Sequence, residues 1–390
     1  MDTYKPAEGS ATRSDIAITD PDFKYPSLWK SNIAADYKFG DGWVATIELL
    51  YSKDINAIYH DNIGLYRTEQ FVNDGGAGNA RPYYNGYYSD REGNQKAANH
   101  VVMLRNTSKG HSLYTTFQLQ KNFVDGILKG LYLNGSYSFG QSRGVTDGTS
   151  SVATSAWKYR AALDGNAEEV GYTAGSFDGR LLLSASYTAN WSKYAATSFG
   201  LIYQRYRPFR YSYCYNGDAN GDSQFSNDLM YIPANFDEVK DHLLPGDFDS
   251  QEDAWKAMNA FIEQDPYLSK HRGEYAERNG AVAPFANQLD LSVSHDIKIY
   301  QKNGRSHTLR FSFNIANFLN LLNRNWGVVQ TTVLGNQQYQ FLTIPKGQGP
   351  SAANNYTLKY TMAKDLDETF KDNLNDVSRW QMQFGIKYIF

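Results

Sequence analysis

The last twelve residues of the chain, "RWQMQFGIKYIF" (Arg379–Phe390), alternate apolar side chains with polar or small ones as far as Tyr388. The apolar set consists of Trp380, Met382, Phe384, Ile386, Tyr388 and Phe390. Because successive side chains of a strand point to opposite faces, this stretch predicts a strand with one apolar face and one polar face. Chain termini usually fray, so a strand that reaches the last residue is expected to be held by a neighbour.

The same alternation recurs upstream, for example in "NQLDLSVSHDIKIY" and "HTLRFSFNIANF". Between these two stretches, Asn303-Gly304 is a strong signal for a tight hairpin turn. The complete pattern predicts nine long strands, at residues 29–39, 43–53, 112–122, 130–140, 180–191, 196–207, 286–300, 307–318 and 379–390.

The predicted connections alternate between short and long. Residues 53–111, 141–179, 208–285 and 319–378 form long polar segments, whereas the connections between them are short. Outer-membrane barrels sort their loops in this way. In lipid every backbone polar group needs an internal partner, so strands must close into a barrel. The polar faces carry Asp, Asn, Gln, Ser and Lys, which are too polar for a packed core. The sequence therefore predicts an all-β, antiparallel transmembrane barrel with long extracellular loops.

One segment of the long loops predicts a helix instead. In "QEDAWKAMNAFIE" (251–263), Ala254, Trp255, Met258 and Phe261 fall near one face. We interpret it as a packing element within a folded loop.

Composition excludes several classes of protein. The 38 basic and 41 acidic residues are nearly balanced, so nothing indicates a nucleic-acid partner. Aromatic residues make up 15% of the chain, with 30 Tyr and 21 Phe, which suits the aromatic girdles of a barrel. Cys214 is the only cysteine, so no intrachain disulfide framework exists. The seven histidines show no ligand spacing, and no nucleophile elbow, phosphate loop or dinucleotide fingerprint is found. We therefore expect no enzyme.

The strand count predicts that more of the barrel precedes this chain. Nine is odd, whereas bacterial single-chain barrels have even counts. If the last strand runs away from the long loops, the first strand must start from them, and residues 1–28 have such loop character. The first fifteen residues also lack a signal-peptide pattern. We expect residues 29–390 to be the C-terminal part of a larger barrel, with residues 1–28 the remnant of an extracellular loop.

Four segments carry a family resemblance: "IAITDPDFKYPSLWKSNIAADYKF" (16–39), "YSKDINAIYHDNIGL" (51–65), "NDLMYIP" (227–233) and "SFNIANFLNLLNRNWG" (312–327). They resemble the C-terminal half of TonB-dependent outer-membrane receptors of Bacteroidota. The most similar subgroup is the Oar-like one, which carries a carboxypeptidase-regulatory-like domain. The resemblance implies a 22-stranded barrel, of which nine strands lie here and thirteen upstream. It also implies a plug domain and a TonB-binding segment, neither of which is recognisable in this sequence.

The resemblance assigns a function to the whole receptor: active uptake of a large ligand across the cell outer membrane. A C-terminal fragment alone is then expected to be inactive. Phe384, Tyr388 and Phe390 match the aromatic C-terminal signal that the barrel-assembly machinery recognises. TonB would be a partner only through the missing N-terminal part. The imported ligand, and a lipoprotein partner capping the receptor, stay open.

The stretch "NGDANGDSQFSND" (216–228) is the strongest candidate site. Asp218, Asn220 and Asp222 occupy positions 1, 3 and 5 of a calcium-loop spacing, and Gln224 and Asp228 follow. Ser223 replaces the usual glycine, and Leu229 stands where such loops place a bidentate glutamate. A structural calcium is one interpretation. A loop of Asx turns, with side chains bonding their own backbone, is the other.

Two weaker sets of residues complete the candidates. Arg205, Arg207 and Arg210 follow a predicted strand, where guanidinium groups could hold the phosphates of lipid A in lipopolysaccharide; a solvated strand end explains them equally. Tyrosines in two predicted loops could stack on a ligand or pack against other loops. These are Tyr83, Tyr84, Tyr87, Tyr88 and Tyr339.

Two other functions stay open. A passive porin or adhesin-like barrel would need an even strand number. An outer-membrane barrel hydrolase would need a Ser–His or Asp–His pair at the rim, and the strand ends offer none that is convincing.

Overall fold

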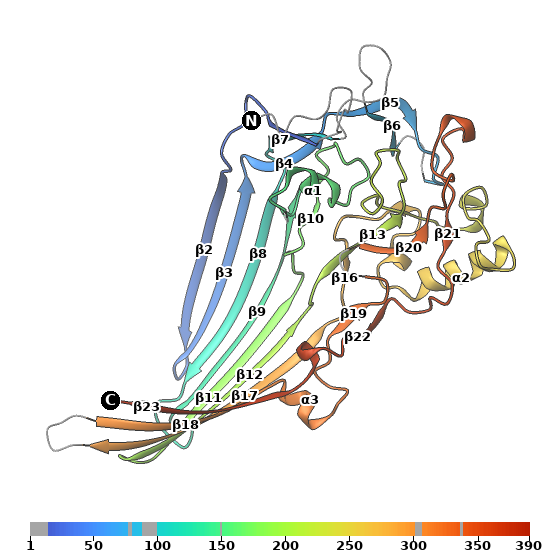
Figure 1. Cartoon of the computed structure of the whole chain (residues 1–390). Coiled ribbons are helices and arrows are strands. Elements are labelled where there is room, and N and C mark those ends of the chain that lie inside the picture. The colour runs from blue at the N-terminus through green and yellow to red at the C-terminus, as the bar shows by residue number, and fades with distance from the viewer. Residues whose placement is uncertain (1–14, 77–79, 88–99, 149, 301–305, 336–337) are drawn as a thin grey trace, which may run out of the picture.

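The computed structural model describes residues 15–76, 80–87, 100–148, 150–300, 306–335 and 338–390. Its largest feature is a twisted antiparallel sheet of nine long strands, each hydrogen-bonded to the next along the chain (Figure 1). The strands are β2 (Leu28–Phe39), β3 (Trp43–Asp54), β8 (His111–Asn122), β9 (Leu131–Gly144), β11 (Arg180–Ser192), β12 (Ala195–Tyr206), β17 (Ala286–Tyr300), β18 (Ser306–Ala316) and β23 (Gln381–Ile389). Among the described strands, β2 and β23 are the two edges.

The register of the sheet separates apolar and polar residues into alternate rows. One row across six strands pairs Leu131, Tyr187, Phe199, Val293, Phe313 and Phe384. The neighbouring row pairs Tyr132, Ser186, Gly200, Ser292, Asn314 and Gln383. Since partner residues lie on the same side of a sheet, the first row belongs to an apolar face and the second to a polar face. Few residues of the nine strands are buried, so neither face is packed against a protein layer.

The connections differ at the two ends of the sheet (Figure 1). At one end, which we call the turn end, short connections such as residues 40–42, 123–130 and 193–194 join neighbouring strands. At the other end, which we call the loop end, residues 55–110, 145–179, 207–285 and 317–380 run between strands. The described helices include none that is both long and apolar enough to cross a membrane.

The loop-end segments contain short elements of their own. The strands are β1 (Ile16–Thr19), β4 (Ala57–Asn62), β5 (Leu65–Phe71), β6 (Pro82–Tyr87), β7 (Val101–Thr107), β10 (Gly171–Tyr172), β13 (Arg210–Asn216), β14 (Tyr231–Ile232), β15 (Glu274–Tyr275), β16 (Ala281–Val282), β19 (Gln330–Thr332), β20 (Gln338–Thr343), β21 (Thr361–Met362) and β22 (Phe370–Asp372). The α-helices are α1 (Ala153–Lys158), α2 (Gln251–Gln264) and α3 (Phe318–Leu322).

These segments pack into one body with its own hydrophobic core, which we call the loop body. Its centre is a small sheet in the order β16, β13, β20, β21. β13 pairs antiparallel with β16 and parallel with β20, and β20 pairs antiparallel with β21. The core gathers Tyr213, Cys214 and Tyr215 from β13 with Tyr339 and Phe341 from β20. Parallel pairing of segments more than a hundred residues apart fixes two long loops to each other.

Helix α2 closes one side of this core. Ser250 is its N-cap, and the Ser250 Oγ accepts a hydrogen bond from the Asp253 backbone N–H at 3.1 Å. Ala254, Met258, Phe261 and Ile262 are buried, which is the stripe expected of an amphipathic helix. The prediction of a packing helix at 251–263 is confirmed.

The predicted strand positions compare well with the observed ones. Each of the predicted ranges overlaps one long strand, with ends that differ by up to four residues. The range 307–318 is too long, because Asn317 adopts a left-handed backbone (φ +51°) and α3 begins at Phe318. The proposed hairpin turn at Asn303-Gly304 lies outside the described residues. Of the predicted loop remnant 1–28, residues 16–19 form β1, which pairs in parallel with β7; residues 1–14 are outside the described part.

Candidate functional site

The acidic loop 217–228 follows directly from the end of β13. Its backbone is shaped by its own side chains: Asp218 Oδ1 accepts hydrogen bonds from the N–H groups of Asn220 and Gly221, and Asp218 Oδ2 accepts one from Ser223. Asp222 Oδ1 accepts the Gln224 N–H at 2.8 Å. Ser223 has a left-handed backbone (φ +67°), so the sharp turn forms although serine replaces glycine there.

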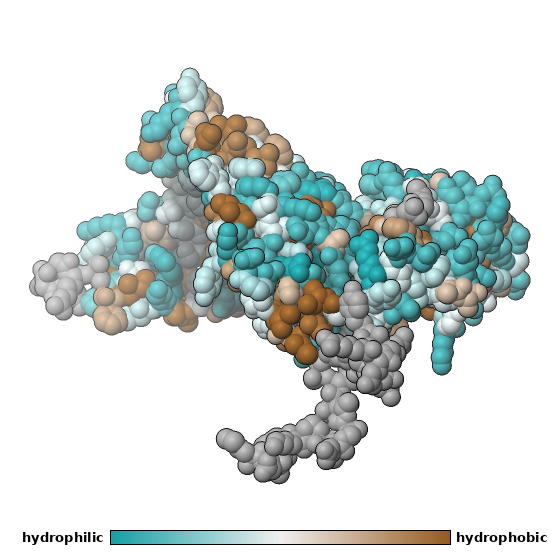
Figure 2. All heavy atoms as spheres, turned by 90° about the horizontal axis from the view of Figure 1, so that it is seen from above, coloured by the Kyte–Doolittle hydropathy of each residue, from teal (hydrophilic) through white to brown (hydrophobic). Residues whose placement is uncertain are grey.

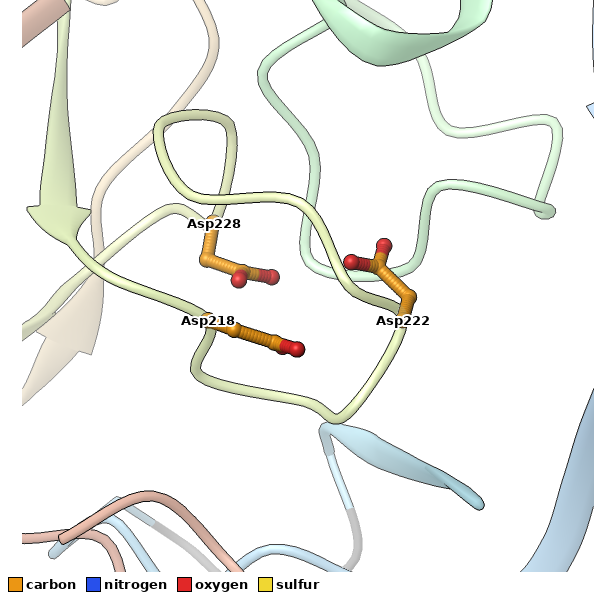
Figure 3. A group of neighbouring side chains, drawn as sticks. All are labelled: Asp218, Asp222 and Asp228. Carbon is orange, nitrogen blue, oxygen red and sulfur yellow. The ribbon is translucent and has the colours of Figure 1, made fainter. Parts of the chain in front are cut away.

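Three carboxylates converge inside this loop. Asp218, Asp222 and Asp228 project into the space that the loop encloses (Figure 3), and each offers an oxygen within 4.8 Å of the others. Asn220 is buried beside them, and its Nδ2 lies 3.4 Å from Asp222 Oδ2. Three of the residues that the calcium-loop spacing identified, Asp218, Asp222 and Asp228, are therefore close together in the folded loop.

Burial makes ionisation of these groups costly. Loss of solvent raises the pKa of Asp222 well above its usual value, and the charges of Asp228 and Asp218 raise it further. Burial also raises the pKa of Asp218, although backbone N–H donors oppose that shift. The pKa of Asp228 rises to about 7, again mainly through burial, with Arg81 opposing the shift.

Arg81 is the only cation that hydrogen-bonds to this cluster among the described residues, and it is fully buried. Its guanidinium lies 3.1 Å from Asp74 and 3.0 Å from Asp228, and it also donates to the carbonyl of Leu229. The rings of Tyr215 and Tyr275 lie against it. Arg81 thus joins the 55–110 segment to the acidic loop. Sequence reasoning did not identify Arg81 or Asp74, because nothing local to them indicates a partner 147 residues away.

The donor set suits a hard cation such as calcium. Asp218, Asp222 and Asp228 supply carboxylate oxygens, whereas one guanidinium shared with Asp74 balances only part of their charge. The amide of Asn220 stabilises the loop instead, since its Oδ1 accepts the Asp222 N–H and its Nδ2 faces Asp222. Leu229 is buried in the core and offers no oxygen, whereas the carboxylate of Asp228, one residue earlier, lies with those of Asp218 and Asp222. Gln224 is buried as well, and its backbone N–H is bound to Asp222.

A hollow of about 470 Å³ lies beside the acidic loop. Gly217, Asp218, Gly221 and Phe225 line one side, and residues 344–347 and 349–351 line the other. The Phe225 side chain is 66% exposed.

Only some of the tyrosines predicted to contact a ligand are exposed. Tyr84 and Tyr339 are buried core residues, so their assignment as ligand contacts is wrong. Tyr84 instead donates a hydrogen bond from its hydroxyl to Asp164, at 2.7 Å. Tyr83 stays partly exposed against Tyr356, and Tyr87 is partly exposed beside His100. Tyr88 lies outside the described residues.

The three predicted phosphate-binding arginines separate into two kinds. Arg205 and Arg207 both lie over the ring of Phe285, and Arg207 is 3.1 Å from Asp178. Arg210 is buried and donates to the backbone carbonyls of Ser176 and Asn279. The prediction that Arg210 faces an outside phosphate is therefore wrong, because its donors hold loop segments together.

Phe384 and Tyr388 lie on the apolar face of β23, and Phe390 follows its last residue. Phe384, Tyr388 and Phe390 are 78%, 58% and 92% exposed. Comparison with models of known families, with curated proteins and with solved structures found no match for this chain.

Proposed function

We propose that this chain is the C-terminal strand region of an outer-membrane barrel that belongs to an active importer. The apolar face of the nine-stranded sheet is the observation that carries the proposal. Its members include Ile33, Ile47, Phe117, Leu183, Phe199, Phe311, Phe384 and Ile386, all at least 40% exposed. An apolar surface of this extent is unstable in water and needs a cover. A bilayer covers it, and antiparallel strands satisfy their backbone groups inside lipid.

Three further observations support this environment. The strands have 9 to 15 residues, a length that suits tilted membrane strands. Trp29, Trp191 and Trp380 lie at or next to strand ends, with 59%, 67% and 42% exposure, as expected of interfacial aromatic girdles. Short connections at one end and a folded loop body at the other match the asymmetry of outer-membrane barrels.

The transport role rests on the resemblance to TonB-dependent receptors. The loop body would face the cell exterior and meet the ligand first. The polar face of the sheet would line the lumen. No catalytic role is proposed for any of these residues.

The open edges of the sheet favour a larger barrel over a complete passive porin. β2 and β23 do not pair with each other in the described structure, so backbone groups on both edge strands await partners.

Cell fractionation and native mass test this proposal together. The protein should be in the outer-membrane fraction, and an antibody against the C-terminal peptide should detect a species far larger than the 44.1 kDa of this chain. Recovery only from soluble fractions would refute the membrane assignment. A 44 kDa outer-membrane species with steady single-channel conductance steps would instead establish the porin alternative.

A further inference from the structure

A second hollow, of about 330 Å³, lies on the loop body between α2 and the segment that follows β21. Figure 1 places α2 beside β21 at the edge of the loop body. Ala257, Ala260, Phe261 and Gln264 of α2 form one wall, and Phe248 contributes from the preceding segment. The other wall runs from Met362 and Ala363 to Asp365, Leu366 and Asp367. We call this hollow the α2 groove.

The α2 groove lies along a second stripe of α2, which we call the groove stripe and which shares Phe261 with the buried core stripe. Ala257, Ala260, Phe261 and Gln264 follow i, i+3, i+4, i+7 spacing, which places them on one face of the helix. Met258 and Ile262 face the core, and Phe261 lies between the two stripes, buried in the core with an edge at the groove. Alanines on the groove stripe are small, so the hollow stays unfilled, and the Ala260 side is exposed.

The two chain segments that form the α2 groove are strongly acidic. Residues 237–265 and 363–376 carry 14 acidic and 4 basic side chains, whereas the whole chain is nearly balanced at 41 and 38. Asp365 and Asp367 are exposed in one wall, and Asp247 and Asp249 are exposed on either side of Phe248. In the view from above, hydrophilic residues dominate the right-hand part of the molecule, which is the end that carries α2 and β21 (Figure 2). The groove therefore combines an apolar floor with negative charge at both walls.

We propose that the α2 groove binds a basic polypeptide segment that inserts one apolar side chain between Ala260 and Leu366. Aliphatic or aromatic side chains suit the Phe248, Phe261 and Met362 surfaces, and flanking lysine or arginine residues complement Asp365 and Asp367. An acidic or uncharged partner would leave this charge without a complement. The proposed membrane function is needed only to place the α2 groove on the cell exterior. The apolar and acidic residues that would bind the peptide do not depend on it.

Peptide binding to the detergent-purified chain tests the proposal. The probe is a fluorescent nine-residue peptide with a central leucine flanked by lysine and arginine, measured by anisotropy. One comparison peptide replaces leucine by serine, and another replaces every basic residue by glutamate. We expect binding of the probe only, with an affinity that falls as salt rises from about 50 to 200 mM because exposed charges are screened.

Matched variants locate the binding. Ala260→Arg fills the groove and adds a positive charge, so the affinity should drop by about ten-fold or more, as expected for a central contact. Asp365→Asn with Asp367→Asn should weaken binding by about three- to ten-fold through lost complementarity. Asp41→Asn with Asp125→Asn removes the same charge at the turn end, where both residues are exposed, and should leave affinity unchanged.

Three outcomes would overturn the proposal: equal binding of the glutamate peptide, probe binding that Ala260→Arg leaves intact, or a concentration-dependent dimer that Ala260→Arg abolishes. The last would assign the groove to a second copy of this chain. Helical content and thermal unfolding of each variant confirm that α2 stays folded. Peptide binding is measured without a membrane. A negative binding result would therefore not affect the membrane proposal, and a negative fractionation result would not affect the proposed peptide site.

Discussion

Arg81 joins two segments of the loop body through buried ion pairs. It lies in a fully buried site between two carboxylates, where removal of one partner leaves charges unpaired. Exposed ion pairs, by contrast, contribute little because water screens them. The loop body also offers an exposed pair, since Lys256 lies 2.9 Å from Asp253 and their side chains are 76% and 46% exposed.

We expect Arg81→Met to destabilise the loop body by about 3–5 kcal/mol, because Asp74 and Asp228 would stay buried without their cation. Lys256→Met is the control and should cost about 0–1 kcal/mol, because both partners of its ion pair are exposed. Denaturant unfolding followed by tryptophan fluorescence measures both, since Trp157 and Trp255 lie in the loop body. Equal effects of the two changes would contradict the assignment.

The acidic loop makes a prediction about pH. The pKa of Asp228 is raised to about 7, and those of Asp218 and Asp222 are also raised, so the folded state binds more protons than the unfolded chain above about pH 4. Without metal, the free energy of unfolding should therefore fall as pH rises from about 4 to 7. Asp222→Asn should flatten this slope, and Asp41→Asn should not. Thermal unfolding between these pH values is the measurement.

Calcium binding at the same loop should reverse that trend. Calcium needs ionised carboxylates, so at about 100 times its dissociation constant it should add about 2.7 kcal/mol at pH 7.5 and little at pH 4.5. Unfolding with calcium or a chelator measures the difference, and Asp222→Asn should remove it. If calcium changes nothing at pH 7.5, the Asx turns and Arg81 hold the loop without an ion.

At the scale of elements, alternate residues of each long strand lie on opposite faces of the sheet, one apolar and one polar. Phe313 and Asn314 are neighbours in β18 with opposite orientations: Phe313 pairs with Val293 and Phe384, and Asn314 pairs with Ser292 and Gln383. If a bilayer covers the apolar face, a charge at position 313 should destabilise the protein much more than a charge at position 314.

Phe313→Arg should destabilise the protein in lipid vesicles by about 2–4 kcal/mol, the cost of a cation on a lipid-facing barrel position near the bilayer centre. Asn314→Arg is the matched control on the polar face, and its effect should be much smaller. Equilibrium unfolding from vesicles measures both. Comparable penalties would mean that lipid does not cover the apolar face.

At the scale of the whole molecule, the two ends of the sheet should lie on opposite sides of the membrane. Asp249 is exposed in the loop body, and Asp125 is exposed in the connection between β8 and β9 at the turn end. Cys214 is fully buried, and burial raises the pKa of its thiol, so it should contribute no background labelling.

A membrane-impermeant maleimide applied to intact cells should label Asp249→Cys and leave Asp125→Cys unlabelled. Labelling of both after permeabilisation is the control for reactivity. The opposite pattern would invert the proposed orientation, and labelling of both in intact cells would exclude a membrane between the two ends.

The sequence alone determined the strands, the sorting of the loops and α2, because alternation with period two and helical spacing are local patterns. It also placed Asp218, Asn220, Asp222 and Asp228 in one site, since all lie within a single loop. Only the tertiary structure decided that Tyr84, Tyr339 and Arg210 are buried rather than exposed. It also decided that Arg81 meets Asp228 and that β13 pairs with β20. These contacts join segments more than a hundred residues apart, and their residues look like ordinary loop residues until packing removes them from water.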